Sequence, residues 1–116
     1  MVKLSDVCSV LNAKIISGAE KLQKEFTAIY ACDLMSEVLA TGSAKGLLIT
    51  TLTSPQVIRT AEMLDLAGII FVNGKIPNTC VINLAHEKSI PLLISDYSLF
   101  ETCGMVYKFI KTAAEG

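Results

Sequence analysis

Three polar segments of this 116-residue sequence carry residue types that could bind an anionic ligand. They are residues 50–55, 73–77 and 95–98, and each follows an apolar run and leads directly into a helical pattern. Free backbone N–H groups and the positive end of the helix dipole favour a negative charge at such a position. Hydroxyl groups add donors for a phosphate, and a carboxylate could accept hydrogen bonds from ribose hydroxyls or an amine. The candidate ligand-binding residues are Thr50, Thr51, Thr53, Ser54, Asn73, Gly74, Ser95 and Asp96.

The same residues also have a purely structural interpretation. Ser, Thr, Asn and Asp are the preferred N-cap residues of helices, and Asn-Gly is a turn signal on its own. The pair Asn73-Gly74 could equally adopt positive φ angles and let a ligand approach the backbone. No GxxxxGK[ST] or GxGxxG motif occurs, so a nucleotide would need a different cradle. Plain capping and a ligand cleft therefore both stay open.

Residues that could catalyse a reaction are sparse. His86 is the only histidine and lies beside Glu87 and Lys88 without an evident catalytic partner. Arg59, the only arginine, could reach a phosphate at a helix start or simply be solvated. We therefore predict no catalytic residue, although a small enzyme acting through Thr50 and Asp96 is an alternative.

The four cysteines do not form a ligand pattern. Zinc and iron–sulfur sites usually take their ligands in close pairs, and this chain has no CxxC. We expect no metal and no cofactor, and we interpret the cysteines as small apolar core residues. A redox accessory protein using Cys32 with Cys80 or Cys103 is the alternative. The cysteines are Cys8, Cys32, Cys80 and Cys103.

The composition excludes several classes of protein. Hydrophobic residues make up 52% and charged residues 18% of the chain, against about 25% charged in an ordinary domain. A disordered chain would have less apolar and more charged content, and a nucleic-acid binder would usually show a basic excess. The net charge is only −1. The apolar excess instead suggests a contact surface, with a homodimer as the simplest symmetric arrangement.

The apolar residues are too dispersed for a membrane protein. The longest apolar run is residues 66–72, whereas a spanning helix needs about 20 mostly apolar residues. Lys3, Ser5 and Asp6 interrupt the N-terminus, so no secretory signal follows Met1. We expect a cytoplasmic protein with reduced thiols.

Three continuous apolar runs predict strands buried on both faces, as in parallel sheets. They are residues 47–50, 69–72 and 92–94, with enough chain between them for one helix each. Ser54 and Pro55 provide the N-cap and first residue of one helix, which Gly68 would stop. Pro77 would open the next helix, with Cys80 on its buried face.

The other elements are predicted from shorter signals. Ser5 would cap a short helix, and residues 14–17 and 26–31 would form strands. Asp33 would cap a helix to about residue 40, and Ser98-x-x-Glu101 is a capping box before the last helix. The predicted fold is one α/β layered sandwich over residues 1–116, with four or five mostly parallel strands and helices on both faces.

These segments, in this order, resemble the DRTGG domain family, which is related to the N-terminal domain of HPr serine kinase/phosphorylase. The resemblance covers residues 3–18, 26–39, 46–77 and 86–110. The family is named for a D-R pair after one strand and T-G-G after the next. The matching stretches here are TLTSP and VNGKIP, in which only Gly74 of the naming residues is retained.

The resemblance implies a non-catalytic regulatory module. DRTGG domains occur beside CBS domains in pyrophosphatases and before phosphotransacetylase catalytic domains. Some short relatives are labelled as hydrogenase-associated, which adds a redox accessory role as an alternative. The kinase activity of the related enzyme belongs to another domain, and its P-loop is missing here. We therefore predict a self-associating interaction module that binds a small anionic or nucleotide-like ligand, or a protein partner, and neither nucleic acid nor membrane.

Overall fold

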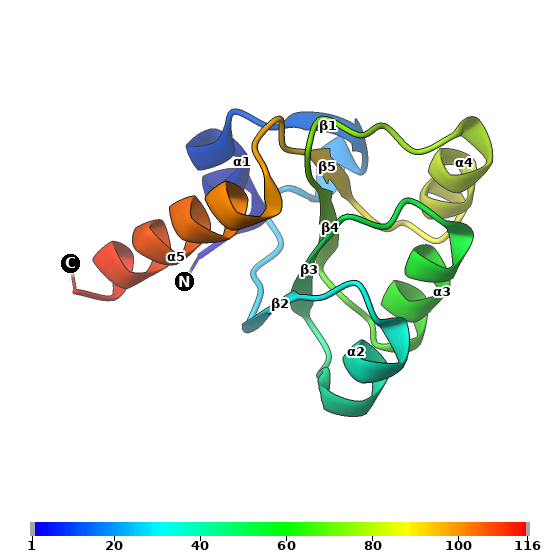
Figure 1. The fold of residues 1–116 in the computed structure, drawn as a ribbon, viewed down its shortest axis with the longest axis horizontal. Coiled ribbons are helices and arrows are strands. Elements are labelled where there is room, and N and C mark those ends of the chain that lie inside the picture. The colour runs from blue at the N-terminus through cyan, green and yellow to red at the C-terminus, as the bar shows by residue number, and fades with distance from the viewer. Residues whose placement is uncertain (1, 116) are drawn as a thin grey trace.

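The computed structural model describes residues 2–115, which form an α/β fold around one five-stranded sheet (Figure 1). The strands are β1 (Lys14–Ser17), β2 (Ala28–Ala31), β3 (Gly46–Thr50), β4 (Gly68–Phe71) and β5 (Leu92–Ile94). The helices are α1 (Leu4–Leu11), α2 (Met35–Thr41), α3 (Pro55–Met63), α4 (Thr79–Glu87) and α5 (Leu99–Glu115), with a 3-10 turn at Ala19–Lys21. The predicted fold class is confirmed.

The sheet has the order β1-β5-β4-β3-β2. Strands β2 to β5 are mutually parallel, and only β1 runs antiparallel to its neighbour β5. Every residue of β3, β4 and β5 is buried, as their continuous apolar runs predict. Strand β2 lies at the edge and contains half-buried residues. It is also shorter than predicted, because Phe26 and Thr27 precede the regular pairing.

Helices cover both faces of the sheet, as predicted. Helices α2, α3 and α4 lie on one face, and α1 and α5 lie on the other (Figure 1). Side chains alternate between the two layers, so Leu48 and Phe71 join the α2–α4 core while Leu47 and Ile70 join the α1–α5 core. Only two helices cover the second face, and the edge strand β2 remains partly open there.

The predicted starts of α1 and α4 are wrong. Helix α1 begins at Leu4, so Ser5 lies inside it, and the carboxylate of Asp6 accepts the N–H of Lys3 at 2.9 Å. Helix α4 begins after Asn78, whose Oδ1 accepts the N–H of Val81 at 3.1 Å. Asn78 is a good N-cap residue and takes that position one residue after Pro77, whereas in α1 a carboxylate in the first turn binds the N–H of the N-cap residue Lys3.

The remaining helix boundaries follow the sequence more closely. Helix α3 starts at Pro55 after Ser54, but it ends at Met63, and Gly68 is the first residue of β4 rather than a helix stop. The predicted capping box is confirmed, since the Ser98 Oγ accepts the Glu101 N–H and the Glu101 Oε1 accepts the Ser98 N–H. Among residues 2–115, no helix is long and apolar enough to cross a bilayer.

Candidate functional site

The eight predicted ligand-binding residues lie at the carboxyl ends of strands β3, β4 and β5, with Thr50 the last residue of β3 and the others in the segments that follow. Because these strands are parallel, their carboxyl ends share one edge of the sheet. Strand β2 is parallel to β3 and brings Asp33 to the same edge. The residues are therefore close in the fold, but hydrogen bonding leaves them unequally available for a ligand.

Asp33 binds the β3–α3 segment instead of capping α2, which corrects the prediction. Its Oδ1 accepts the Thr50 hydroxyl and the Thr51 N–H, both at 2.7 Å, and its Oδ2 accepts the Thr51 hydroxyl at 2.6 Å. Leu34 occupies the N-cap position of α2 and provides no side-chain bond. The pairing of β2 with β3 places the carboxylate beside these three donors, so it satisfies them rather than the first turn of α2.

This hydrogen bonding changes the acidity of Asp33. Partial burial raises its pKa, but the hydrogen bonds from Thr51 and Thr50 and the charge of Lys75 outweigh that effect and lower the pKa below its ordinary value. Asp33 is therefore ionised at neutral pH. Its negative charge disfavours a phosphate beside the Thr50 and Thr51 hydroxyls, which already donate to it.

Ser95 is also engaged. It is fully buried, and its Oγ lies 2.8 Å from the Oγ1 of Thr102 on α5 and 3.3 Å from the N–H of Tyr97. Thr102 was not among the predicted site residues. Its position just after the Ser98–Glu101 capping box is the signal that could have placed it on the first buried turn of α5. This bond fixes α5 to the end of β5.

Asn73 and Gly74 form the predicted turn, with φ angles of 61° and 65°. Their N–H groups donate to the carbonyl oxygens of Tyr97 and Ser95, both at 2.8 Å, and are thus not offered to a ligand. A Cβ atom on Gly74 would lie 3.1 Å from the Oδ1 of Asp96. Glycine at this position therefore lets the Asp96 carboxylate approach the turn.

Four of the predicted residues keep available polar side chains. Within residues 2–115 the side chains of Thr53, Ser54, Asn73 and Asp96 make no hydrogen bond, and Ser54 occupies the N-cap position of α3 without capping it. The Asp96 carboxylate is also not used to cap α5, because Ser98 does so. Lys75 is exposed and close enough to lower the pKa of Asp33.

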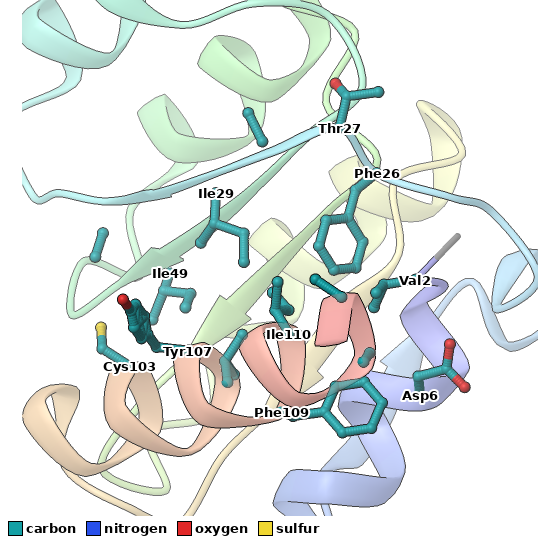
Figure 2. Close-up of a pocket in the computed structure, with 15 residues that line it drawn as sticks. Val2, Asp6, Phe26, Thr27, Ile29, Ile49, Cys103, Tyr107, Phe109 and Ile110 are labelled. Carbon is teal, nitrogen blue, oxygen red and sulfur yellow. The ribbon is translucent and has the colours of Figure 1, made fainter. Parts of the chain in front are cut away.

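A separate feature is an apolar groove of about 850 Å³ on the α1–α5 face. Figure 2 shows Ile110 pointing from α5 toward Phe26, and Cys103 and Tyr107 lying near Ile49. This groove was not predicted from the sequence, because its walls come from three distant segments, the N-terminus, β2 and α5. The lining residues are Val2, Asp6, Phe26, Thr27, Ala28, Ile29, Ala31, Ile49, Cys103, Val106, Tyr107, Phe109, Ile110, Ala113 and Ala114.

The cysteines are all free thiols. Cys80 is exposed, so its predicted place on the buried face of α4 is wrong, and the other three are half-buried. Burial raises the pKa of the Cys8 and Cys103 thiols, which favours the unreactive protonated form. Among the residues that the structure describes, no three His, Cys, Asp or Glu side chains gather to hold a metal ion.

Comparison with known proteins places these features in a family. The DRTGG domain model matches residues 6–109, and no curated protein matches the sequence. The fold resembles the CBS and DRTGG domains of the regulatory region of Clostridium perfringens pyrophosphatase, solved with the activator diadenosine tetraphosphate. The TM-score is 0.75 at 15% identity, over 90% of this chain and 45% of that one. This chain therefore spans less than half of its structural relative. The family match over most of the chain shows that it belongs to the DRTGG domain family.

Proposed function

We propose that this chain is a non-catalytic regulatory module, a single DRTGG-like domain over residues 1–116 that works by self-association. The observation that carries the proposal is the apolar groove of about 850 Å³ between α5, β2 and the N-terminus. Exposed apolar surfaces of this kind are typical of contact sites, and identical chains most often associate as twofold dimers. The regulatory role of the pyrophosphatase region with the same fold supports this interpretation.

Tyr107 is the residue to change in a test, since it lines the groove and is 60% exposed. A buried charge without a partner is costly at an interface, so Tyr107→Glu is expected to weaken self-association by about tenfold or more. Light scattering after gel filtration at ~50 µM would then give a dimer for the unmodified chain and a lower mass for Tyr107→Glu.

The matched control is Met63→Glu, which changes a 73% exposed apolar residue on α3, outside the groove. It should behave as the unmodified chain does. Equal masses for Tyr107→Glu and the unmodified dimer, or an unmodified chain that stays monomeric, would contradict the proposal.

A second candidate function is the binding of a nucleotide-like ligand at the carboxyl edge of the sheet. The available side chains of Thr53 and Ser54 at the start of α3 support it, together with the nearby cation of Lys75. Asp96 could accept hydrogen bonds from ribose hydroxyls. The phosphates would then contact α3 and Lys75, since Asp33 repels them from Thr50 and Thr51.

A thermal-shift measurement with millimolar ATP and inorganic pyrophosphate tests this candidate. Binding to the folded state alone raises the melting temperature, by several degrees when the ligand greatly exceeds its dissociation constant. The Lys75→Ala variant should lose most of the shift, whereas Lys88→Ala, at the C-terminal end of α4, should keep it. Unchanged melting temperatures with both ligands would exclude this function and leave self-association as the proposal.

We also propose a cytoplasmic location, because four free thiols suit a reducing compartment.

The two alternative functions considered from the sequence, a small enzyme and a redox accessory protein, receive no support. The Thr50 hydroxyl, required by the enzyme alternative, already donates to Asp33. The redox alternative requires converging sulfurs, yet no disulfide joins the cysteines, which lie on α1, α4 and α5 and, for Cys32, in the segment after β2.

A further inference from the structure

We propose that a second copy of the chain covers the exposed side of α5 next to the apolar groove. The two α5 helices pack antiparallel, with Tyr107 of each over Gly104 of the other. This inference rests on the proposed function, because it takes self-association as given and names the surface and register through which it occurs.

Helix α5 presents an unusual stripe to solvent. Phe100, Gly104 and Tyr107 follow one another at four- and three-residue spacing, so they lie on one face of the helix. Phe100 is 87% exposed and Tyr107 is 60% exposed, although both are large aromatic residues. Tyr107 also lines the groove, so the stripe and the groove form one continuous apolar surface.

Gly104 lies at the centre of this stripe. A Cβ atom there would meet nothing within 4 Å, so no contact inside the chain requires glycine. Glycine in the middle of a helix costs about 1 kcal/mol relative to alanine. Its effect on the surface is a depression between two aromatic side chains, and a helix with a small residue at the contact allows a partner to approach closely.

The charge of the surface argues for a second copy rather than a lipid. Among the residues that the structure describes, Asp6 is the one charged side chain that lines the groove, and it already accepts the N–H of Lys3. No cation is among the described residues that line the groove, and Lys111 lies outside it with its Nζ 5.9 Å from the centroid of the Tyr107 ring, so a fatty acid would find no cation inside the groove to bind its headgroup. An apolar helix face with lysines beside it would complement this apolar surface and its acidic residue Asp6. Helix α5 carries such lysines at Lys108 and Lys111.

Helix α5 is also complementary to itself when reversed. Glu101 lies near its start, while the two lysines lie toward its end. If Gly104 of one copy faces Tyr107 of the other, three residues back along the first helix lie opposite three residues forward along the second. Glu101 then lies opposite Ile110 of the other copy, between that copy's Lys108 and Lys111. The twofold axis repeats this pairing, so two acidic–basic contacts form. A parallel arrangement would place like charges together.

Substitution of Gly104 by leucine separates folding from association. The new side chain enters open space in the single chain and improves helix propensity, so the melting temperature measured at low protein concentration should stay the same or rise. In the dimer it would occupy the space of Tyr107, and self-association should weaken by about tenfold or more. Asn83→Leu, at an exposed position inside α4, is the matched control and should leave association unchanged.

A charge exchange tests the register independently. Lys108→Glu should weaken the dimer, and adding Glu101→Lys to the same chain should restore much of the loss in sedimentation equilibrium. The proposal is overturned if Gly104→Leu folds and associates as the unmodified chain does, or if the double variant is no stronger than Lys108→Glu. Should the unmodified chain stay monomeric, the proposed function fails as well. If Tyr107→Glu abolishes association but Gly104→Leu and the charge variants leave it unchanged, the proposed function stands and only the antiparallel pairing of the α5 helices fails.

Discussion

Replacing Phe71 with alanine is expected to lower the free energy of unfolding by about 3–5 kcal/mol. Phe71 is the last residue of β4, is fully buried, and belongs to the core between the sheet and helices α2–α4. The substitution removes the transfer free energy of a benzyl group and leaves a cavity that regular strands on either side cannot close. Urea denaturation followed by circular dichroism measures the loss.

Phe100→Ala provides the control for this prediction, because it deletes the same group from an 87% exposed position. At ~1 µM protein, where self-association contributes little, it should change the free energy of unfolding by less than about 0.5 kcal/mol. Losses of similar size for the two variants would show that the core assigned to Phe71 is wrong.

Asp33→Ala is expected to lower the free energy of unfolding by about 2 kcal/mol. The variant removes the acceptor of three hydrogen bonds, and one of them comes from the fully buried Thr50. Because the carboxylate itself is exposed, we expect a smaller loss in the free energy of unfolding than three buried hydrogen bonds to a charged group would give. Asp96→Ala, which removes an exposed carboxylate without a hydrogen bond to the described residues, should have little effect in the same urea titration.

The same interaction predicts a dependence on pH. The folded-state pKa of Asp33 is lowered, so its contribution is fully present above the unfolded-state pKa of about 3.9 and is lost as pH falls through the lower folded-state value. Stability should therefore decrease in this acid range more steeply for the unmodified chain than for Asp33→Asn. Identical slopes would contradict the assigned hydrogen bonds.

The strands could be predicted because their signal is local. Continuous apolar runs gave β3 to β5 to within a residue, since strands covered on both faces need apolar side chains throughout. The capping box at Ser98 and the proline at the start of α3 are equally local and were found. Glu101 and Pro55 each act on the first turn of their own helix, so no knowledge of the fold is needed to place them.

The parts that failed depend on which elements become neighbours. Asp33 has the same local pattern as an N-cap, and only the β2–β3 pairing makes Thr50 and Thr51 its donors. The antiparallel direction of β1 and the groove beside β2 likewise follow from the packing of distant segments. The apolar excess in the composition predicts a contact surface, and the position that we propose for it depends on the exposure of Tyr107 on α5, which the sequence alone does not reveal.

Several hydroxyl groups at the carboxyl edge of the sheet are hydrogen-bonded within the chain and are not free to bind a ligand. In the sequence its hydroxyl groups suggest a phosphate cradle, whereas in the structure Asp33 and Thr102 take the hydrogen bonds of Thr50, Thr51 and Ser95. Much of this polar edge therefore connects the strand ends to neighbouring segments and to α5. An apolar groove of about 850 Å³ lies on the α1–α5 face, which is why we propose self-association before ligand binding.

Sedimentation equilibrium of the unmodified chain between ~1 and ~200 µM tests this claim most directly. We predict a reversible increase in mass with concentration, from the chain's 12.5 kDa toward twice that value and no further. A single species of 12.5 kDa over the whole range, or assembly that continues beyond a dimer, would contradict the account.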